Sequence, residues 1–112
     1  MVKKKYLPKR GDIVWTNFNP ATGHEKKGKR PALVLSQTPF NRKILLAMVV
    51  PITSRVRGHG FEVPLDGKKI KGVALCQQAK MIDFTERGVQ FVEKAPRSVT
   101  NDALARVRAI IG

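Results

Sequence analysis

Cysteine and histidine are scarce in this chain of 112 residues, and their scarcity excludes stabilisation by disulfides or by a structural zinc site. The single cysteine, Cys76, cannot form an internal disulfide, and its place in the apolar residues 73–76 favours a small buried hydrophobic side chain. One cysteine and two separated histidines, His24 and His59, cannot make a structural zinc site. We therefore expect a fold held together by its hydrophobic core, with no metal and no other cofactor.

Long apolar runs and acidic residues are also few. The longest apolar run, residues 44–52, is too short to span a bilayer, and the basic residues 1–10 lead into no apolar stretch of the kind that secretory signals contain. Eight Asp and Glu stand against 22 Lys and Arg, a net charge of +14, and 16 of the basic residues lie in residues 1–72. We expect a cytoplasmic protein without a membrane partner that binds a polyanion, nucleic acid above all.

Short apolar segments separated by basic, glycine-containing loops predict a single, mainly β domain over residues 1–112. The expected strands are residues 12–18, 32–36, 43–53, 61–65, 72–82 and 87–92. Pro51 predicts a bulge or a sheet edge near the end of the third strand. Several short strands at this spacing are typical of a small barrel or sandwich.

The C-terminal residues show a different period. Four apolar residues recur there at helical spacing: Leu104, Val107, Ile110 and Ile111. This pattern predicts an amphipathic α-helix that packs on the barrel. Ser98 or Thr100 is the expected N-cap, with Asp102 in the first turn.

One arginine, Arg30, stands between a basic loop and an apolar strand, directly before Pro31. A residue before proline is held extended, so Arg30 is expected at the lip of the strand. Binding and catalytic groups often sit on loops that a rigid scaffold positions. A solvated loop that leads into a strand is the alternative interpretation.

Residues 51–60 carry a second polar cluster. Thr53 and Ser54 end the central strand, and Arg55 and Arg57 follow. Hydroxyls and arginines at a strand end fit phosphate recognition, and a merely polar strand terminus is the alternative.

The two histidines offer a weaker signal. His24 and His59 both lie in basic loops flanked by glycine, and a histidine pair can cleave RNA by acid–base catalysis. Loop histidines in a basic protein are more often exposed groups or phosphate contacts, so we favour this mechanism less. The sequence contains no paired-carboxylate metal site, no Ser-His-Asp context and no phosphate-binding P-loop.

Taken in order, these segments resemble the MazF/PemK family of toxin endoribonucleases over nearly the whole chain. The motifs that carry the resemblance are RGDIVW (10–15), FNP (18–20), GHE (23–25), RPALVLS (30–36), PITS (51–54), GFEV (60–63) and GVALCQQAK (72–80). Each motif alone is unspecific, but their order and spacing together are specific.

The resemblance implies a MazF/CcdB-like, SH3-like β-barrel with a C-terminal helix, a homodimer, and sequence-specific, ribosome-independent cleavage of single-stranded RNA. It also implies a cognate MazE-like antitoxin whose acidic, flexible tail occupies the RNA groove. The family's catalytic arginine falls on Arg30 and its catalytic threonine on Thr53. Some members carry an aspartate where this chain has Gln77, so a carboxylate role cannot be assigned there.

These assignments give Arg30 a chemical purpose. Cleavage by an internal 2′-hydroxyl passes through a highly charged phosphorane, which a fixed guanidinium can stabilise. Thr53 would orient the 2′-hydroxyl or donate to a phosphate oxygen. Because the sequence offers neither a metal site nor an obvious protein nucleophile, we expect metal-independent cleavage that leaves a 2′,3′-cyclic phosphate and a 5′-hydroxyl. Glu25 is a candidate base, with contact to an RNA base edge or pairing with Lys29 as alternatives.

The remaining candidates are contacts rather than catalysts. The expected substrate-binding residues are His24, Glu25, Lys29, Ser54, Arg55, Arg57, His59, Gln78 and Lys80. Three aromatic residues, Trp15, Phe18 and Phe40, are expected in the core or in an interface rather than as stacking platforms.

Two other functions stay open. A related toxin family, CcdB, shares this architecture but poisons DNA gyrase by binding, and a plain nucleic-acid-binding barrel would have the same composition. The Arg30/Thr53 pairing favours the ribonuclease, whereas composition alone favours the barrel. The cleavage motif depends on loop conformation and is not encoded in any pattern that we can identify.

Overall fold

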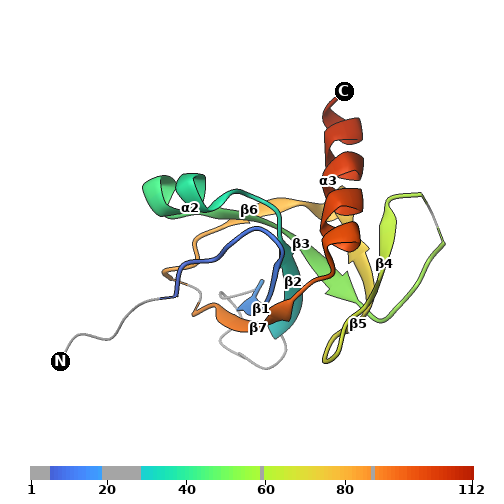
Figure 1. Ribbon diagram of the computed structural model, residues 1–112, viewed down its shortest axis with the longest axis horizontal. Helices are drawn as coiled ribbons and strands as arrows, with labels where there is room; N and C mark the ends of the chain where they lie inside the picture. The colour runs from blue at the N-terminus through green and yellow to red at the C-terminus, as the bar shows by residue number, and fades with distance from the viewer. Residues whose placement is uncertain (1–5, 19–28, 59, 87) are drawn as a thin grey trace.

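A strongly curled β-sheet with an α-helix against it forms the body of the molecule (Figure 1). The computed structural model describes residues 6–18, 29–58, 60–86 and 88–112. Its elements are β1 (Asp12–Asn17), β2 (Lys29–Val34), α2 (Thr38–Ile44), β3 (Ala47–Thr53), β4 (Glu62–Asp66), β5 (Lys71–Leu75), the 3-10 turn η2 (Cys76–Gln78), β6 (Lys80–Ile82), β7 (Gln90–Lys94) and α3 (Arg97–Ile111). The described residues form one seven-stranded sheet in the order β4-β5-β3-β2-β1-β7, with β6 on β3. The predicted β fold with a C-terminal helix is confirmed.

Strand β3 is the centre of the sheet because its residues are apolar on both faces. It pairs with β2 along one edge, while its other edge pairs with β6 up to Val49 and with β5 from Ile52 onward. Pro51 lies where the partner changes, a position at which the missing N–H does the least harm to a ladder. The irregularity predicted near Pro51 is therefore a change of partner strand.

Two clusters of buried side chains lie on opposite faces of the curled sheet. Alternate residues of a strand point to opposite faces, so Leu33 and Val50 belong to one cluster and Val34 and Val49 to the other. The first cluster includes Ala103 and is covered by α3. Burial on both faces explains why the central strands lack a clear alternation of polar and apolar residues.

Two of the sequence predictions for strands were too long. The strand expected over residues 43–53 begins only at Ala47, because residues 38–44 form α2, with Pro39 in its first turn. The strand expected over residues 72–82 is interrupted by η2. The other strands shift by one to three residues, and β2 extends backward to include Arg30.

Helix α3 forms as predicted but begins earlier. It starts at Arg97, after Pro96, with no side-chain cap, so the expected capping by Ser98 or Thr100 was wrong. Asp102 lies beyond the first turn and pairs with Arg106 at 3.2 Å, a spacing of one helical turn. None of the helices in the described part of the chain has the length and apolarity that crossing a membrane requires.

Candidate functional site

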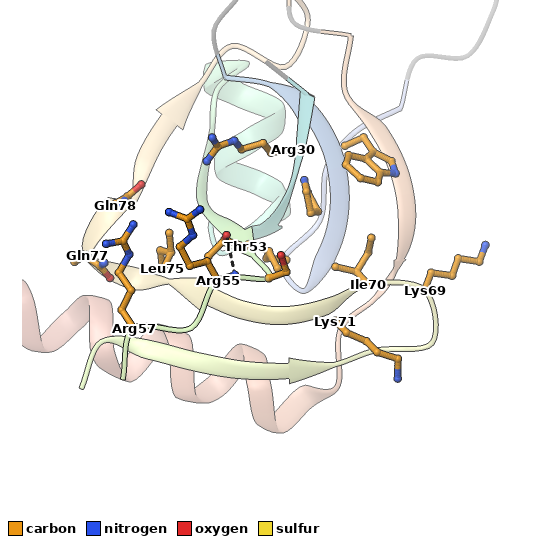
Figure 2. A pocket seen from close by; sticks show the side chains of 14 residues that line it. Arg30, Thr53, Arg55, Arg57, Lys69, Ile70, Lys71, Leu75, Gln77 and Gln78 are labelled. Atoms are coloured by element: carbon orange, nitrogen blue, oxygen red, sulfur yellow. Dashed lines mark hydrogen bonds between the residues drawn. The ribbon is translucent and has the colours of Figure 1, made fainter. Parts of the chain in front are cut away.

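A groove of about 1040 Å³ opens where β2, β3 and β5 meet (Figure 2). It is lined by Trp15, Arg30, Pro31, Ile52, Thr53, Ser54, Arg55, Arg57, Lys69, Ile70, Lys71, Leu75, Gln77 and Gln78. Five of these side chains are cationic, and none of the described lining residues is acidic. Such a concentration of one charge in a concave surface attracts anions.

Arg30 and Thr53 both line this groove because the β2–β3 ladder positions their strands side by side. The last pair of that ladder is Ala32 with Pro51. Two residues farther along each strand, Arg30 and Thr53 are on the same face of the sheet, because side chains alternate along a strand. Figure 2 shows the exposed guanidinium of Arg30 extending over the groove, with Thr53 on the neighbouring strand.

The hydroxyl of Thr53 is oriented by its own loop. The backbone N–H of Arg55 donates to Thr53 Oγ1 over 3.2 Å (Figure 2). A hydroxyl that accepts one hydrogen bond still has its proton to donate. Thr53 is therefore suited to donate toward a ligand in the groove.

Strand β5 approaches the backbone of Thr53 closely, and glycine makes the approach possible. Gly72 has φ +148°, and a Cβ at this position would lie 2.2 Å from the carbonyl oxygen of Thr53. A side chain at position 72 would thus displace β3 at the residue that carries the hydroxyl.

The loop that follows Thr53 is held by a buried carboxylate. Glu62 of β4 accepts the N–H of Arg57 at 2.9 Å and the N–H of Gly58 at 2.7 Å. Because these bonds use only the backbone, the side chains of Arg55 and Arg57 are available to the groove, as Figure 2 shows.

The turn between β4 and β5 is held in the same way at the other side of the groove. Glu93 of β7 accepts the N–H groups of Lys68, Lys69 and Ile70 at 3.1, 2.9 and 2.8 Å. The bond from Ile70 is the main cause of a pKa of Glu93 below its ordinary value, and the bonds from Lys69 and Lys68 lower it further. Two separate carboxylates thus fix the two basic segments that border the groove.

The groove gathers six of the residues that the sequence singled out: Arg30, Thr53, Ser54, Arg55, Arg57 and Gln78. Lys29 is exposed at the start of β2 and does not line it. Lys80 also lies outside the lining, with its ammonium 5.1 Å from the centroid of the Phe18 ring. The candidates His24, Glu25 and His59 fall outside the described residues.

Sequence reasoning missed four polar or aromatic lining residues: Trp15, Lys69, Lys71 and Gln77. The basic run DGKKIKG (66–72) is a hairpin-turn signal, but it does not indicate that the turn borders the groove. Trp15 was expected in the core or an interface, but it is half-buried and faces the groove. Phe18 packs against a core cluster as expected, whereas Phe40 is 38% exposed on α2.

Cys76 takes no part in this site. It is fully buried, and burial is the main cause that raises the pKa of its thiol to about 11. The thiol is therefore protonated at neutral pH, and the prediction of a small buried side chain is confirmed. The described residues contain no group of three or more His, Cys, Asp or Glu side chains placed to hold a metal ion.

Comparison with known proteins finds relatives over almost the whole chain. A family described as PemK-like, MazF-like toxin of type II toxin-antitoxin system matches residues 9–111. The endoribonuclease PemK of Escherichia coli is 38% identical over 116 residues, which cover 99% of this chain and 87% of PemK. The endoribonuclease toxin MazF of E. coli K12 is 43% identical over 84 residues, covering 75% of this chain and 76% of MazF.

Solved structures of MazF proteins are similar to this chain as well. MazF (Form-I) of Deinococcus radiodurans has a TM-score of 0.86 at 36% identity and covers 96% of this chain and 99% of its own. The MazE-MazF structure (Form-II) from the same organism has a TM-score of 0.84 at 32% identity, covering 96% of this chain and 98% of that one. The predicted MazF-like fold is therefore confirmed.

Proposed function

The chain belongs to the family of PemK-like, MazF-like toxins of type II toxin-antitoxin systems, and on that premise we propose that it is an endoribonuclease that cleaves single-stranded RNA. Its relatives PemK and MazF are named endoribonucleases. The observation that carries the proposal is the meeting of Arg30 and Thr53 in a groove lined by five cations. The phosphates of an RNA strand match that charge, and the exposed guanidinium of Arg30 would bind the scissile phosphate.

The cleavage we propose uses the RNA's own hydroxyl as the nucleophile. The 2′-oxygen forms a bond to the adjacent phosphorus, the bond from phosphorus to the 5′-oxygen breaks, and the products are a 2′,3′-cyclic phosphate and a 5′-hydroxyl. Arg30 binds the phosphate oxygens, whose charge grows as the phosphorane forms. Thr53, whose oxygen already accepts the Arg55 N–H, donates a hydrogen bond to a phosphate oxygen.

The proton of the 2′-hydroxyl needs an acceptor. An arginine, with its pKa above about 12, and an unassisted threonine are poor bases. None of the described groove residues is a carboxylate or a histidine, and the candidate base is Glu25, which lies outside the described residues. The departing 5′-oxygen takes its proton from water. The less favoured mechanism would instead use His24 and His59, also outside the described residues.

We propose that no metal ion takes part, since the attacking group comes from the substrate. The test compares an RNA with the same strand carrying a single deoxyribose on the 5′ side of the cut, both in EDTA. We expect discrete fragments from the first and bound but uncut oligonucleotide from the second, because the phosphates that dominate affinity are unchanged. Cleavage of the deoxy strand, or a requirement for magnesium, contradicts the mechanism.

The same purified protein separates the nuclease from its rivals. Incubation with a long defined transcript, without ribosomes, should give fragments whose mapped ends share a sequence motif. Binding without fragments would indicate a plain nucleic-acid-binding barrel, and trapping of DNA gyrase would indicate a CcdB-like poison.

The partners that we propose follow the same premise. The D. radiodurans neighbour was solved as MazE-MazF, and an acidic antitoxin segment would complement the cationic lining of the groove. We propose a homodimer as well, which is supported by apolar side chains exposed on α2 and β6: Phe40, Ile44 and Met81. The molar mass in solution, measured by light scattering, tests the dimer.

A further inference from the structure

The groove continues past Arg30 and Thr53 on two sides. In Figure 2, Gln77 and Gln78 lie on one side of Thr53, and Ile70 and Lys69 lie on the other. The second side has no role in the cleavage chemistry described above. Trp15 also lines the groove, and its strand β1 pairs with β7, whose Glu93 binds the backbone of Lys69 and Ile70. These residues supply three kinds of group that single-stranded nucleic acid uses: an aromatic ring, an apolar side chain and a cation.

The aromatic group is Trp15, and the sheet holds it rigidly. Strand β1 lies between two neighbours, so Trp15 is paired with Pro31 of β2 and with Gln90 of β7. The indole is half-buried and lines the groove, which leaves part of its surface open to a ligand. An aromatic ring fixed by two ladders offers a stacking surface at little entropic cost.

The cation and the apolar side chain come from one immobilised turn. Lys69 and Ile70 both line the groove, and both donate their backbone N–H to Glu93, at 2.9 and 2.8 Å. Gly67 completes this arrangement, because a Cβ there would lie only 2.6 Å from Glu93 Oε2. The turn is thus held in shape before any ligand arrives, which reduces the cost of binding.

Lys69 is the lysine of this turn best placed to bind an anion. Lys71 already pairs with Asp66 at 2.6 Å, although both side chains are highly exposed and such pairs are weak. The charge of Lys69 helps to lower the pKa of Glu93, but the oxygens of that carboxylate are occupied by backbone N–H groups. The ammonium of Lys69 therefore remains available to a phosphate.

We propose that this end of the groove is a nucleotide subsite, in which a base stacks on Trp15 beside Ile70 and the adjoining phosphate binds Lys69. The subsite rests on the proposed use of the groove for single-stranded RNA and adds a contact remote from the cleaved bond. Base–aromatic stacking tolerates any base, so the subsite contributes affinity and register rather than a sequence requirement.

Trp15 is the only tryptophan of the chain, so its fluorescence reports on the subsite directly. The probe is a mixed-sequence RNA of about 12 nucleotides, a length typical of single-strand binders, with 2′-fluoro sugars that remove the attacking hydroxyl. We expect saturable quenching as the probe binds. A matched oligomer of abasic nucleotides should bind through its phosphates but leave the fluorescence unchanged.

The variant Lys69→Ala tests the phosphate contact. Losing one contact to a single strand should make the slope of log K against log salt shallower by about 0.7. The matched control is Lys43→Ala, an exposed lysine on α2 that does not line the groove, and it should keep the wild-type slope. Glu93→Gln should weaken binding although it removes no lysine, because the turn loses its charged acceptor.

Two results overturn the subsite: tight binding of the probe without quenching, or a Lys69→Ala slope equal to that of wild type. Equal quenching by the abasic oligomer also contradicts stacking. None of these measurements involves cleavage. A protein that is quenched by the probe but cuts no RNA would refute the proposed nuclease and leave the subsite standing. A protein that cuts RNA but shows no quenching would refute only the subsite.

Discussion

Arg30 and Thr53 stand on neighbouring antiparallel strands, each two residues beyond the last pair of the β2–β3 ladder. The ladder fixes their backbones, and its end leaves both side chains on the lining of the groove. The core of the protein thereby directs a guanidinium and a hydroxyl into the same groove.

Replacing Arg30 with alanine should abolish most cleavage and spare the fold. The side chain is exposed, so we expect a stability change within about 0.5 kcal/mol, as for ordinary surface positions. The rate should fall by about a hundredfold to a thousandfold, the usual cost of losing one preorganised donor. Arg30→Lys should recover little, because an ammonium cannot reproduce the planar fork. Single-turnover kinetics measure the rate and thermal melts measure the stability, with Arg42→Ala on α2 as the control. Near-normal turnover by Arg30→Ala would remove Arg30 from the mechanism.

Thr53→Val keeps the shape of the side chain and deletes the hydroxyl. We expect kcat to fall by roughly a hundredfold while KM changes little, since the donor acts on charge that develops during the reaction. Thr85→Val, which removes an exposed hydroxyl outside the groove, is the control and should leave kcat and KM nearly unchanged. A parallel loss of affinity and rate would make Thr53 a positioning contact only, and no loss would make it a polar strand end.

Gly72→Ala should disturb the site by displacing the backbone of Thr53. The added Cβ meets the carbonyl oxygen of Thr53 at 2.2 Å, in a backbone conformation that L residues rarely adopt. Gly58→Ala separates the two effects, because Gly58 also has positive φ, +84°, but nothing lies within 4 Å of its added Cβ. We expect denaturant unfolding to show a loss of order 1–3 kcal/mol for Gly58→Ala and a larger one for Gly72→Ala. Only Gly72→Ala should also lower kcat, and equal effects of the two changes would show that the close approach is unimportant.

Glu62→Gln should loosen the loop that carries Arg55 and Arg57. The amide keeps one acceptor oxygen but loses the charge that strengthens the bonds from Arg57 and Gly58. Charge-assisted bonds of this kind contribute about 1.5–3 kcal/mol each, so we expect a measurable loss of stability. KM for RNA should rise more than kcat falls, because the loop binds rather than reacts. Asp66→Asn, at a carboxylate that is 85% exposed, is the control.

Glu93 should make a contribution to the free energy of unfolding that depends on pH. Its pKa is lowered in the folded protein by the N–H of Ile70 and then by those of Lys69 and Lys68. The stabilisation is therefore fully present above the ordinary glutamate pKa of about 4.3 and is lost as pH falls through the lower folded value. The difference in unfolding free energy between wild type and Glu93→Gln should be constant near neutral pH and shrink in acid. A flat difference for Glu93→Gln down to full acid unfolding would contradict the role of the carboxylate.

The strands could be predicted because short apolar segments alternate with basic, glycine-containing loops, and the last helix because its apolar residues recur at helical spacing. Helix α2 could not be, since Ile44 at its end and the two leucines that follow run directly into the apolar residues of β3 and hide the boundary. Within the site, Arg30 and Thr53 stood out because polar groups there end apolar strands. The lysines at positions 69 and 71 did not, because their place in the groove depends on how β4 and β5 fold back beside β3. Pairing at a distance of this kind leaves no local pattern.

Glu62 and Glu93 hold the two groove loops through hydrogen bonds from peptide N–H groups, which any residue except proline supplies. The side chains of those loops can therefore be exchanged while the loops keep their course. Substitutions at the non-glycine positions of these loops can change which ligands the groove binds at little cost to the fold. The same two loops are where an engineer would randomise residues to redirect the cut.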